Sequence, residues 1–534
     1  MTTKKRARIE VKLAAGETVR RLSPWRVLLA LFVLAVLGAS GTFGFRNWRA
    51  TQAAVSHKPW FAGYVDVSAT PSFPFEQLGQ TNHKDAVLSF IVSMPNDECT
   101  PAWGAAYSLS KAGDRLDLDR RIARLQQQGG SVAVSFGGRD NQELAVSCTD
   151  TKKLQTAYES VINRYDINTI DLDLENRGLT DQTAAVRRAT VLANIQKERR
   201  AHGKPLAIWV TLPVATFGMT EDGTNAISQL LAHGVDLAGV NAMTMEFGSS
   251  KPKDESMAKA SEQALTQTAR QLGILYQQAG THLNDASVWA KLGATPMIGQ
   301  NQDESEVFGI DDAKALNGFA LDHHISRISI WSSNRDIQCG GNYVNVKAVS
   351  NSCSGVDQDK LEFSDLLGKN FNGSIALSAG IETSADPVDS SKTAKDDPAN
   401  SPYQIWTASG AYLEGTKVAW HHSVYQAKWW TQGDVPDNPV LQTWQTPWEL
   451  IGPVLPNEKP IPQPTLPAGT YSDWSGSNKY DTGQRVLFNG VPYQAKWWNQ
   501  GESPAAAASN PDASPWVPLT QQQVNDIEDG LSAK

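Results

Sequence analysis

The sequence predicts an α/β chain with a (β/α)8 TIM barrel, a small module that occurs twice, and an N-terminal transmembrane helix. Three observations predict this architecture. Eight short β-branched runs alternate with helix-length segments, a tryptophan-rich segment repeats with an offset of 68 residues, and a stretch of 19 residues near the N-terminus carries no charge. At 534 residues the chain is too long for one compact core. Its hydrophobic content of 40% excludes wholesale disorder.

The charge balance argues against a nucleic-acid-binding protein. The chain has 48 Lys and Arg against 56 Asp and Glu, which gives a net charge of −8, and its basic block lies at the N-terminus. A surface that binds a phosphate backbone needs concentrated positive charge. We therefore expect no nucleic acid among the partners.

The first 45 residues predict a membrane signal. Residues 1–26 carry eight Lys or Arg and two acidic residues, whereas residues 27–45 carry no charge. A helix of 19 residues is about 28 Å long, close to the thickness of the hydrocarbon core. Because the positive side of such a helix stays inside, residues 1–26 are predicted to be cytoplasmic and everything after residue 45 to lie outside.

A cleaved signal peptide is the alternative for this segment. Its most apolar part is only Val27–Leu37, and Leu37–Ser40 offers small residues to a signal peptidase. The long basic region and the full uncharged span favour a retained, single-pass anchor. Both alternatives make the bulk of the chain extracellular, either anchored to the cell membrane or secreted.

The cysteines agree with export. The chain has four, an even number that is compatible with two disulfides in an oxidising compartment. Four cysteines allow three pairings, of which we favour Cys99–Cys148, on neighbouring loops, and Cys339–Cys353, which closes a local loop. No C-x-x-C spacing occurs, so we expect no zinc site, and nothing suggests a cofactor.

The barrel is predicted over residues 58–355. The candidate strands are Phe61–Val67, Ala86–Val92, Ser131–Gly137, Thr169–Glu175, Ala207–Val214, Gly239–Met245, Ala294–Gly299 and Arg327–Trp331. Helix-like segments lie between most of them, among them Asp114–Gln128, Thr151–Tyr165, Asp181–His202, Ser256–Gln278 and Asp311–His323. This size and rhythm fit eight β/α units. A doubly wound open sheet is the competing fold, but no G-x-G-x-x-G opens a helix after the first strand.

The remaining chain is predicted to be a tail and linker followed by two copies of one module. Residues 356–402 form the tail and linker, and residues 453–469 form a proline-rich spacer. Tyr-Gln-Ala-Lys-Trp-Trp recurs verbatim at 425–430 and 493–498, and the register holds through the flanking Trp, Tyr and Gly positions. We define residues 403–452 as module 1 and residues 470–519 as module 2. Of the 17 tryptophans, ten lie between positions 406 and 516.

The fourth candidate strand carries three acidic residues on one face. Side chains alternate along a strand, so Asp171, Asp173 and Glu175 share a side while the intervening Ile and Leu residues face the other way. In a barrel these carboxyls point inward, with Glu175 nearest the C-terminal mouth where active sites form. Carboxyls this close in a low-dielectric interior cannot all ionise, so at least one pKa is expected to rise, as a general acid requires. A solvated strand edge is the alternative.

Asp171-x-Asp173-x-Glu175 resembles the D-x-D-x-E signature of the family 18 glycoside hydrolases, the chitinase family. Further motifs at the strand ends extend the resemblance to the compact bacterial and archaeal subgroup: Ser135–Gly138, Asn241–Glu246, Thr295–Asn301 and Ser329–Trp331. The resemblance covers residues 58–355.

The resemblance implies a substrate-assisted, retaining hydrolysis of a β-1,4-linked N-acetylglucosamine chain. Glu175 would protonate the glycosidic oxygen, and the sugar's own acetamido group would attack its anomeric carbon. Asp173 would hold the acetamido N–H, and Asp171 would hold Asp173. Trp331 would form the floor of the sugar site, although barrel core is the alternative for it. The other implied substrate-binding residues are Tyr64, Met243, Met245, Glu246 and Gln300.

Two departures from the family pattern affect this site. Asn168 stands where the longer motif D-x-x-D-x-D-x-E has its first Asp. Met243-Thr244-Met245-Glu246 stands where many members have Met-x-Tyr-Asp, so the tyrosine that would hold the acetamido carbonyl is missing at that position. We expect activity nonetheless, with an altered geometry around the acetamido group.

The repeats resemble the small all-β chitin-binding modules of carbohydrate-binding families 5 and 12. The shared features are the opening Trp, a Tyr-x-x-Gly, the Ala-Lys-Trp-Trp run and the closing Pro-Trp. Exposed aromatic side chains can stack on a flat polysaccharide, and the predicted platforms are Trp429, Trp430, Trp497 and Trp498. Modules of this size need large core residues, and Trp406, Trp448, Trp474 and Trp516 are predicted to supply them.

These observations predict an exported chitinase that binds chitin or N-acetylglucosamine oligomers, with a membrane contact through the N-terminal helix. Two alternatives remain. One is a chitin-binding lectin on an inactive barrel, against which the intact Glu175 argues. The other is an endo-β-N-acetylglucosaminidase that acts on glycoprotein or peptidoglycan. The pairs His323-His324 and His421-His422 lack a third partner at a useful spacing, so surface or packing roles are expected for them.

Overall fold

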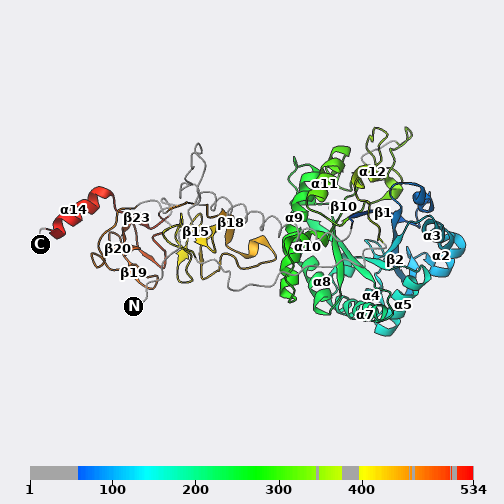
Figure 1. Cartoon of the computed structure of the whole chain (residues 1–534), viewed down its shortest axis with the longest axis horizontal. Helices are drawn as coiled ribbons and strands as arrows, with labels where there is room; N and C mark the ends of the chain where they lie inside the picture. The colour runs from blue at the N-terminus through cyan, green and yellow to red at the C-terminus, as the bar shows by residue number, and fades with distance from the viewer. Residues whose placement is uncertain are drawn as a thin grey trace, which may run out of the picture.

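The computed structural model describes residues 58–343, 348–375, 396–455, 457–459, 463–505, 507 and 514–532. In Figure 1 the barrel lies at one end, and the two modules and the C-terminal helix α14 (Gln521–Ser532) extend from it. The predicted cytoplasmic segment 1–26 and the predicted transmembrane helix 27–45 lie outside the described residues. Within the described ranges, no helix combines the length and the apolar character that a membrane crossing requires.

Eight parallel strands form a closed barrel, which confirms the predicted (β/α)8 fold. In order around the barrel they are β1 (Trp60–Asp66), β2 (Asp85–Met94), β5 (Val132–Gly137), β6 (Thr169–Asp173), β7 (Ala207–Ala215), β9 (Leu237–Met243), β10 (Leu292–Thr295) and β13 (Arg327–Ile328). The barrel closes because β1 pairs in parallel with both β2 and β13. The last two strands are shorter than predicted.

Within the described part of residues 58–375, five short strands lie outside the eight-stranded barrel. β3 (Asp97–Trp103) pairs antiparallel with β2, and β4 (Tyr107–Ser108) pairs with β3. β8 (Gly218–Met219) folds back on β7, and β11 (Gly299–Gln300) forms a hairpin with β12 (Val307–Phe308). These additions follow the carboxyl ends of barrel strands, so they build the rim of the mouth.

The predicted helices are present, and one of them is divided. The structure has α5 (Thr151–Arg164), α7 (Gln182–Ala201), α9 (Met257–Gln278) and α11 (Ile310–Asp322) within a residue or two of the predicted bounds. The predicted helix 114–128 is instead α2 (Leu109–Arg115) and α3 (Leu118–Gln127), because Asp117 between them adopts a left-handed conformation with φ 50°. The other helical segments are η1 (Phe75–Gln80), α4 (Leu144–Ser147), α6 (Asn176–Thr180), α8 (Glu221–Ala232), η2 (Gly248–Ser250), α10 (Asp285–Ala290), η3 (Ser333–Arg335) and α12 (Phe363–Leu367).

Side-chain caps define where the longer helices begin. The Asp150 carboxylate accepts from the first amides of α5, Asp181 accepts at α7, and the Ser256 hydroxyl accepts at α9. Each cap satisfies backbone donors that have no partner inside the helix. Buried apolar residues on one face of each helix then pack against the outside of the barrel, as Leu154 and Val161 of α5 do.

The barrel core extends beyond the predicted boundary at residue 355. Phe363 and Leu367 of α12, and Phe371 after it, are buried in the main hydrophobic core. Ile375 is buried with the aromatic cluster inside the barrel, and its amide donates to the Asp85 carboxylate over 2.8 Å. The segment predicted as a linker from residue 356 therefore begins as part of the barrel, because its apolar residues cover the barrel's N-terminal end and one flank.

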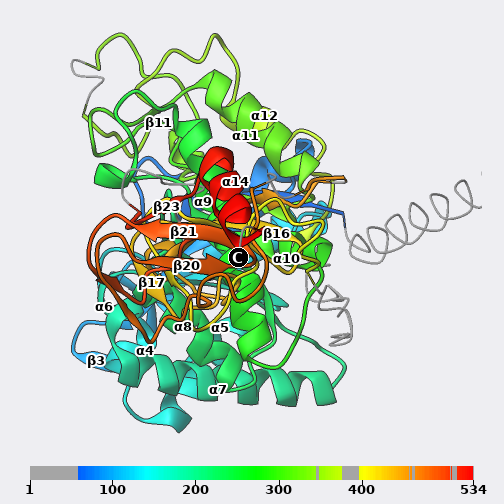
Figure 2. The same ribbon diagram turned by 90° about the vertical axis from the view of Figure 1, so that its left-hand side faces the viewer.

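Each repeat folds into two small antiparallel sheets, so the two small all-β modules are confirmed. In module 1, β14 (Ala411–Tyr412) pairs with β17 (Thr431–Gln432), and β15 (Lys417–Trp420), β16 (Ser423–Ala427) and β18 (Trp448–Pro453) form the second sheet, with η6 (Thr443–Gln445) before β18. In module 2 the counterparts are β19 (Lys479–Tyr480) with β22 (Asn499–Gln500), and β20 (Arg485–Phe488), β21 (Val491–Ala495) and β23 (Trp516–Pro518). Figure 2 shows the molecule from the module end, with α14 in front.

Tryptophans build the cores of both modules. Trp406 and Trp448 are buried in module 1, and Trp516 is buried in module 2. Trp474 is partly buried and packs against the core of module 2. The rings of Tyr412 in module 1 and Tyr480 in module 2 meet the closing tryptophans edge to face, at centroid distances of 5.3 and 5.1 Å. Large rings supply the apolar area that so short a chain otherwise lacks.

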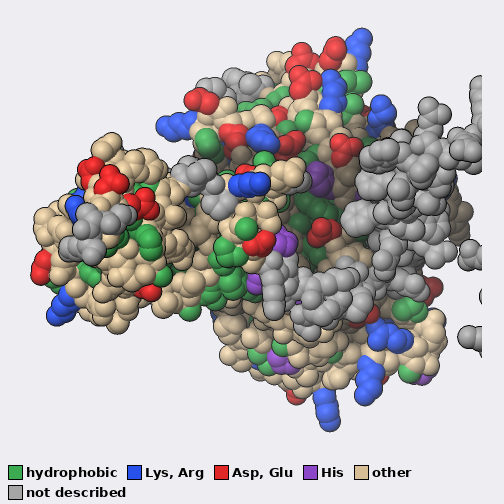
Figure 3. Space-filling view, turned by 60° about the vertical axis from the view of Figure 1, so that its left-hand side comes forward, with side chains coloured by type: hydrophobic (Ala, Val, Ile, Leu, Met, Phe, Trp, Pro, Cys, Tyr) green, Lys and Arg blue, Asp and Glu red, His purple; other side chains and the backbone are tan. Residues whose placement is uncertain are grey.

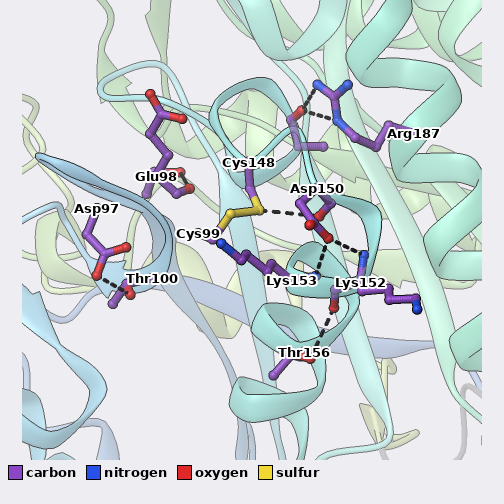
Figure 4. The surroundings of a disulfide bond; sticks show 12 residues. Asp97, Glu98, Cys99, Thr100, Cys148, Asp150, Lys152, Lys153, Thr156 and Arg187 are labelled. Carbon is purple, nitrogen blue, oxygen red and sulfur yellow. Dashed lines mark hydrogen bonds between the residues drawn. A yellow bond between two sulfur atoms is a disulfide. The ribbon is translucent and has the colours of Figure 1, made fainter.

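Both predicted disulfides are present. Cys99 of β3 is bonded to Cys148, which follows α4, and the Cα atoms lie 4.7 Å apart. Figure 4 shows this bond above the start of α5, where the Asp150 carboxylate caps the helix. Cys339 is bonded to Cys353, with the Cα atoms 5.0 Å apart, in the segment that follows the last barrel strand. The described residues contain no free cysteine.

Candidate active site

A cleft of about 320 Å³ opens at the C-terminal mouth of the barrel. It is lined by side chains from the ends of several strands, as a TIM-barrel active site is. Seven of the predicted site residues line it: Tyr64, Asp173, Glu175, Met243, Met245, Glu246 and Trp331. The structure thus brings together residues that are far apart in the sequence.

Asp171 lies beneath the cleft and is fully buried. Its Oδ2 accepts from the Tyr64 hydroxyl over 2.8 Å and from the Ser135 hydroxyl over 2.7 Å. Its Oδ1 accepts from the Thr211 hydroxyl and from Arg327 Nη1, both over 2.7 Å. With both oxygens engaged, Asp171 is an anchor for the site and has no oxygen free for a substrate.

Arg327 is the counter-charge that this buried carboxylate requires. Its guanidinium is buried inside the barrel, donates to Asp171 and also donates from Nη2 to the Tyr64 hydroxyl over 2.9 Å. Arg327 Nε donates to the Ser329 hydroxyl over 3.0 Å. A buried ion pair is favourable only when its remaining donors are satisfied, and all three guanidinium nitrogens have a partner here.

Asp173 differs from Asp171 although it lies on the same strand face. Its side chain is 5% exposed, and its Oδ1 has no hydrogen-bond partner in the described structure. Burial, together with the charges of Glu175 and Asp171, raises the pKa of Asp173 well above its ordinary value, and Arg327 only partly opposes this. Asp173 therefore lies at the wall of the cleft with a raised pKa, and its Oδ1 has no hydrogen-bond partner among the described residues.

Glu175 lies just past the end of β6 and directly before α6, in extended backbone conformation. The sequence placed it on the strand, but the strand ends at Asp173 and Leu174 then bonds to the Thr211 carbonyl of β7. Partial burial raises the pKa of Glu175 to about 7, with Arg139 opposing the rise and Asp140 adding to it. A carboxyl with this pKa holds its proton about half of the time at neutral pH, as a catalytic acid and base must.

Trp331 and Phe90 form an aromatic floor beside these acids. Their rings stack with centroids 5.5 Å apart and an interplanar angle of 26°. Tyr64 approaches the Trp331 ring at 6.1 Å and 63°. Trp331 is partly exposed and lines the cleft, so it has a surface available to a ligand besides its contacts with the core.

Glu246 joins two loops of the rim. It follows β9, and its Oε1 accepts from the amide of Gln302 over 2.6 Å. Glu306 makes the reverse connection, because its carboxylate accepts from the amides of Phe247 and Gly248 over 3.0 and 2.7 Å. The side chain of Glu246 therefore lines the cleft while it holds the loop that carries Gln302.

Gln300 is the predicted site residue that the structure places outside the cleft. It belongs to the β11–β12 hairpin and is buried, and its amide group donates to the carbonyls of Asn301 and Asp303 over 3.1 and 3.4 Å. The hairpin turns this side chain into the loop, and Gln302 lines the cleft instead. A substrate contact of Gln300 stays a prediction.

Sequence reasoning missed several contributors to the site, among them Phe90, Arg139, Asp140 and Arg327. Arg327 could have been predicted from the sequence, because a charged residue at an inward position of a buried strand needs a buried partner. No sequence pattern pointed to the other three. Phe90 lies within β2, at a register shift between Leu88 and Ile91, and Arg139 and Asp140 lie in the loop after β5.

The platform tryptophans are exposed in both modules. Trp429, Trp430, Trp497 and Trp498 all rank among the exposed large apolar side chains. The ammonium group of Lys428 lies 4.8 Å from the ring of Trp429, and that of Lys496 lies 4.5 Å from the ring of Trp497. The same Lys-on-Trp contact in both copies fixes the first ring of each pair and leaves the second more exposed.

The histidine pairs have packing and surface contacts. His323 bonds to the Phe319 carbonyl and stacks on its ring, while His421 bonds to Asp437 and His422 lies beside Asp396. Across the described residues, no cluster of His, Cys, Asp and Glu could hold a metal ion. Figure 3 shows basic and acidic side chains interspersed on the face that it draws.

Known proteins resemble both the barrel and the C-terminal modules of this chain. Residues 473–517 match carbohydrate-binding module family 5/12. The chain is 32% identical over 307 residues to a probable bifunctional chitinase/lysozyme of Escherichia coli, covering 56% of this chain and 34% of that protein. It is 31% identical over 307 residues to Endochitinase 11 of Metarhizium anisopliae, covering 55% of this chain and 56% of that protein.

A solved structure resembles the barrel. The catalytic domain of a hyperthermophilic chitinase from Pyrococcus furiosus aligns with a TM-score of 0.50 and 26% identity, covering 59% of this chain and 96% of that domain. The chain spans about a third and just over half of the length of the two curated relatives. These likenesses bear out the predicted resemblance to chitinases over the barrel and to carbohydrate-binding module family 5/12 over residues 473–517.

Proposed function

We propose that this chain is a chitinase that hydrolyses β-1,4 linkages between N-acetylglucosamine units and is directed to insoluble chitin by its two modules. One observation carries the proposal. Glu175, with a pKa of about 7, lies beside a buried Asp173 whose pKa is also raised, at the mouth of a barrel that resembles chitinase barrels. Such a pair can supply both a proton and a hydrogen bond to a sugar bound over the aromatic floor.

In the proposed mechanism Glu175 gives its proton to the glycosidic oxygen as the bond to the anomeric carbon breaks. The 2-acetamido oxygen of the same sugar attacks that carbon and forms a bicyclic oxazolinium ion. The Glu175 carboxylate then takes a proton from a water molecule, whose oxygen opens the ring at the anomeric carbon. Two inversions at one carbon leave the configuration retained.

Asp173 is proposed to orient the acetamido group and to stabilise its positive charge. Its Oδ1, which has no partner in the described structure, can accept the acetamido N–H, and a carboxylate at this position would place a negative charge beside the oxazolinium ion. Asp171 holds the position of this strand through Arg327, Tyr64, Ser135 and Thr211, which stay bonded to it. Trp331 supports the apolar face of the sugar.

Replacing Glu175 with Gln tests this assignment. The amide has the same shape and no proton to give, so activity on a soluble chitin hexamer is expected to fall by roughly 100-fold or more. Products resolved by anomer show whether the parent releases the β-anomer first. Asp140→Asn is a matched control in the same cleft that keeps the acid; turnover is expected to persist, with its pH dependence shifted because Asp140 raises the pKa of Glu175. A parent that binds chitin and shows no turnover contradicts the proposal and favours a lectin.

The tryptophan pairs of module 1 and module 2 are proposed to bind chitin. Their exposure and their repeated Lys contacts support this role. So does the match of residues 473–517 to a carbohydrate-binding family. Two tethered modules raise the apparent affinity when both reach one surface.

Peptidoglycan is a second candidate substrate, because one relative at 32% identity is named a probable bifunctional chitinase/lysozyme. Both polymers contain N-acetylglucosamine, which supplies the acetamido group that the mechanism needs. Parallel assays of the parent and of Glu175→Gln on chitin hexamer and on purified peptidoglycan separate the two. Turnover of peptidoglycan that depends on Glu175 would extend the substrate class.

Residues 1–26 and 27–45 are proposed to anchor the protein in the cell membrane with the barrel outside. The basic segment, the uncharged span and the two disulfides of the barrel support this placement. Cell fractionation with an antibody against the barrel tests it. A full-length product in the membrane fraction is expected, whereas a shortened product in the medium would indicate cleavage after the apolar span.

A further inference from the structure

Module 1 carries a segment that contacts the barrel. This segment, Val440–Trp444, precedes β18 and lies against α9 and β8, and Figure 1 shows module 1 next to α9. The guanidinium of Arg270 donates to the carbonyls of Val440 and Leu441 over 2.6 and 2.7 Å. Gln271 Nε2 donates to the Leu441 carbonyl over 3.1 Å. Three side-chain donors on one barrel helix thus bind the backbone of the module.

Side chains of module 1 also contact the barrel. Gln442 is buried, and its Nε2 donates to the carbonyl of Met219 in β8 over 2.9 Å. Leu441 packs against the main barrel core. Trp444 meets the ring of Phe217 edge to face with centroids 4.9 Å apart. The contact therefore combines a hydrogen-bonded centre with apolar edges, as a specific interface does.

The second copy of the module lacks this segment. At the offset of 68 residues, Val-Leu-Gln-Thr-Trp at 440–444 is replaced by Ala-Ser-Asn-Pro-Asp at 508–512. The match to family 5/12 falls on module 2, so that family pattern does not require a tryptophan at the position of Trp444. Since both copies keep the platform and core tryptophans, the divergence at 440–444 is specific to the copy that touches the barrel.

Module 2 continues the array by stacking on module 1. The amide of Ser503 donates to the carbonyl of Ala411 over 3.2 Å, and Ala411 forms a parallel bridge with Glu502. Barrel, module 1 and module 2 are therefore joined by direct contacts as well as by linkers.

We propose that Val440–Trp444 is a docking segment that fixes module 1 on the barrel, so that the cleft and the aromatic platforms meet an insoluble polysaccharide as one body. The inference rests on the proposed chitin hydrolysis for its functional part. A module on a free tether would bring the barrel near the solid without orienting it, whereas a docked module sets the orientation of the cleft. Activity on a soluble oligomer needs no such orientation.

The test replaces the docking segment in the full-length chain with the residues that module 2 has at the same positions: Val440→Ala, Leu441→Ser, Gln442→Asn, Thr443→Pro and Trp444→Asp. The described strands of both modules have the same two-sheet arrangement, so the replacement is expected to keep the module fold. Arg270→Ala removes two hydrogen bonds of the same contact on the barrel side. Trp430→Ala is the matched control, because Trp430 and Trp444 are both 53% exposed and only Trp444 contacts the barrel.

Both docking variants are expected to increase the maximum dimension of the protein in small-angle X-ray scattering. They should keep the rate on chitin hexamer and the binding to chitin, and lower the rate on insoluble chitin by roughly threefold or more. Trp430→Ala should weaken chitin binding and leave the scattering unchanged.

Unchanged scattering in both docking variants overturns the inference. Loss of chitin binding equal to that of Trp430→Ala also overturns it, since Trp444 would then be a sugar contact. A parent that does not hydrolyse the hexamer refutes the proposed function, and the scattering comparison still decides whether the segment docks the module.

Discussion

At the scale of single residues, the site separates three carboxyls by their surroundings. Asp171 forms an ion pair with Arg327 and accepts four hydrogen bonds, whereas Asp173 is buried with an Oδ1 that has no partner among the described residues. Glu175 is partly buried near one positive charge, Arg139, and one negative charge, Asp140. The end of β6 and the residue just past it therefore carry an anchor, a buried acid with a raised pKa and an acid that titrates near neutral pH. The alternation of acidic residues in the sequence predicted the shared face, but their different roles depend on partners from other strands.

The pH dependence of kcat/KM follows from Glu175. The acid must be protonated in the free enzyme, so kcat/KM is expected to fall as the pH rises through about 7. Asp140 raises this pKa, so Asp140→Asn should move the alkaline limb to lower pH. Arg139 lowers it, so Arg139→Gln should move the limb to higher pH. Profiles on chitin hexamer check both, and shifts in the same direction would contradict the assignment.

Removing Arg327 should strongly destabilise the barrel. Arg327→Met leaves the Asp171 carboxylate buried without its counter-charge, which costs about 3–5 kcal/mol in comparable pairs. Denaturant unfolding of the barrel measures the loss, and Arg327→Met with Asp171→Asn should recover part of it. Arg200→Met is the control, since its exposed pair with Asp236 contributes about 1 kcal/mol or less. Equal effects of Arg327→Met and Arg200→Met would argue against the buried pair.

At the scale of elements, the rim of the barrel is built from short additions to a regular framework. The strands and most of the helices follow directly from periodicity and capping residues. The β3–β4 extension, the β11–β12 hairpin and the Glu246–Gln302 contact do not, because they are set by loop packing. These loop contacts place Met243, Met245 and Glu246 along the cleft and hold the Gln300 side chain inside its own hairpin.

The two disulfides should differ in their effect on stability. Cys99–Cys148 spans 49 residues and Cys339–Cys353 spans 14, so the first restricts the unfolded chain more. Loop-closure entropy predicts losses of about 4 and about 3 kcal/mol for the Cys99→Ala/Cys148→Ala and Cys339→Ala/Cys353→Ala double variants. Denaturant midpoints of the two variants provide the measurement. A larger loss from the short loop would show that native contacts outweigh chain entropy.

At the scale of the whole molecule, the chain combines one catalytic cleft with two aromatic platforms. Trp430 and Trp498 are the more exposed rings of their pairs. Trp430→Ala with Trp498→Ala should weaken binding to insoluble chitin by roughly tenfold or more, because both tethered contacts are lost together. Pull-down isotherms measure this, and the rate on chitin hexamer should stay at the parental value. Unchanged binding would show that other surfaces hold the polymer.

The sequence by itself determined the barrel, the repeat, the two disulfides and the acidic strand that faces the cleft. These features arise from local periodicity, from verbatim duplication and from a small number of possible cysteine pairings. Only the tertiary structure decided the pairing of Asp171 with Arg327 across 156 positions, the stacking of Phe90 on Trp331 and the contact of Val440–Trp444 with α9. The physical reason is that burial and counter-charge are properties of neighbours in space, and residues far apart in sequence become neighbours when the barrel closes.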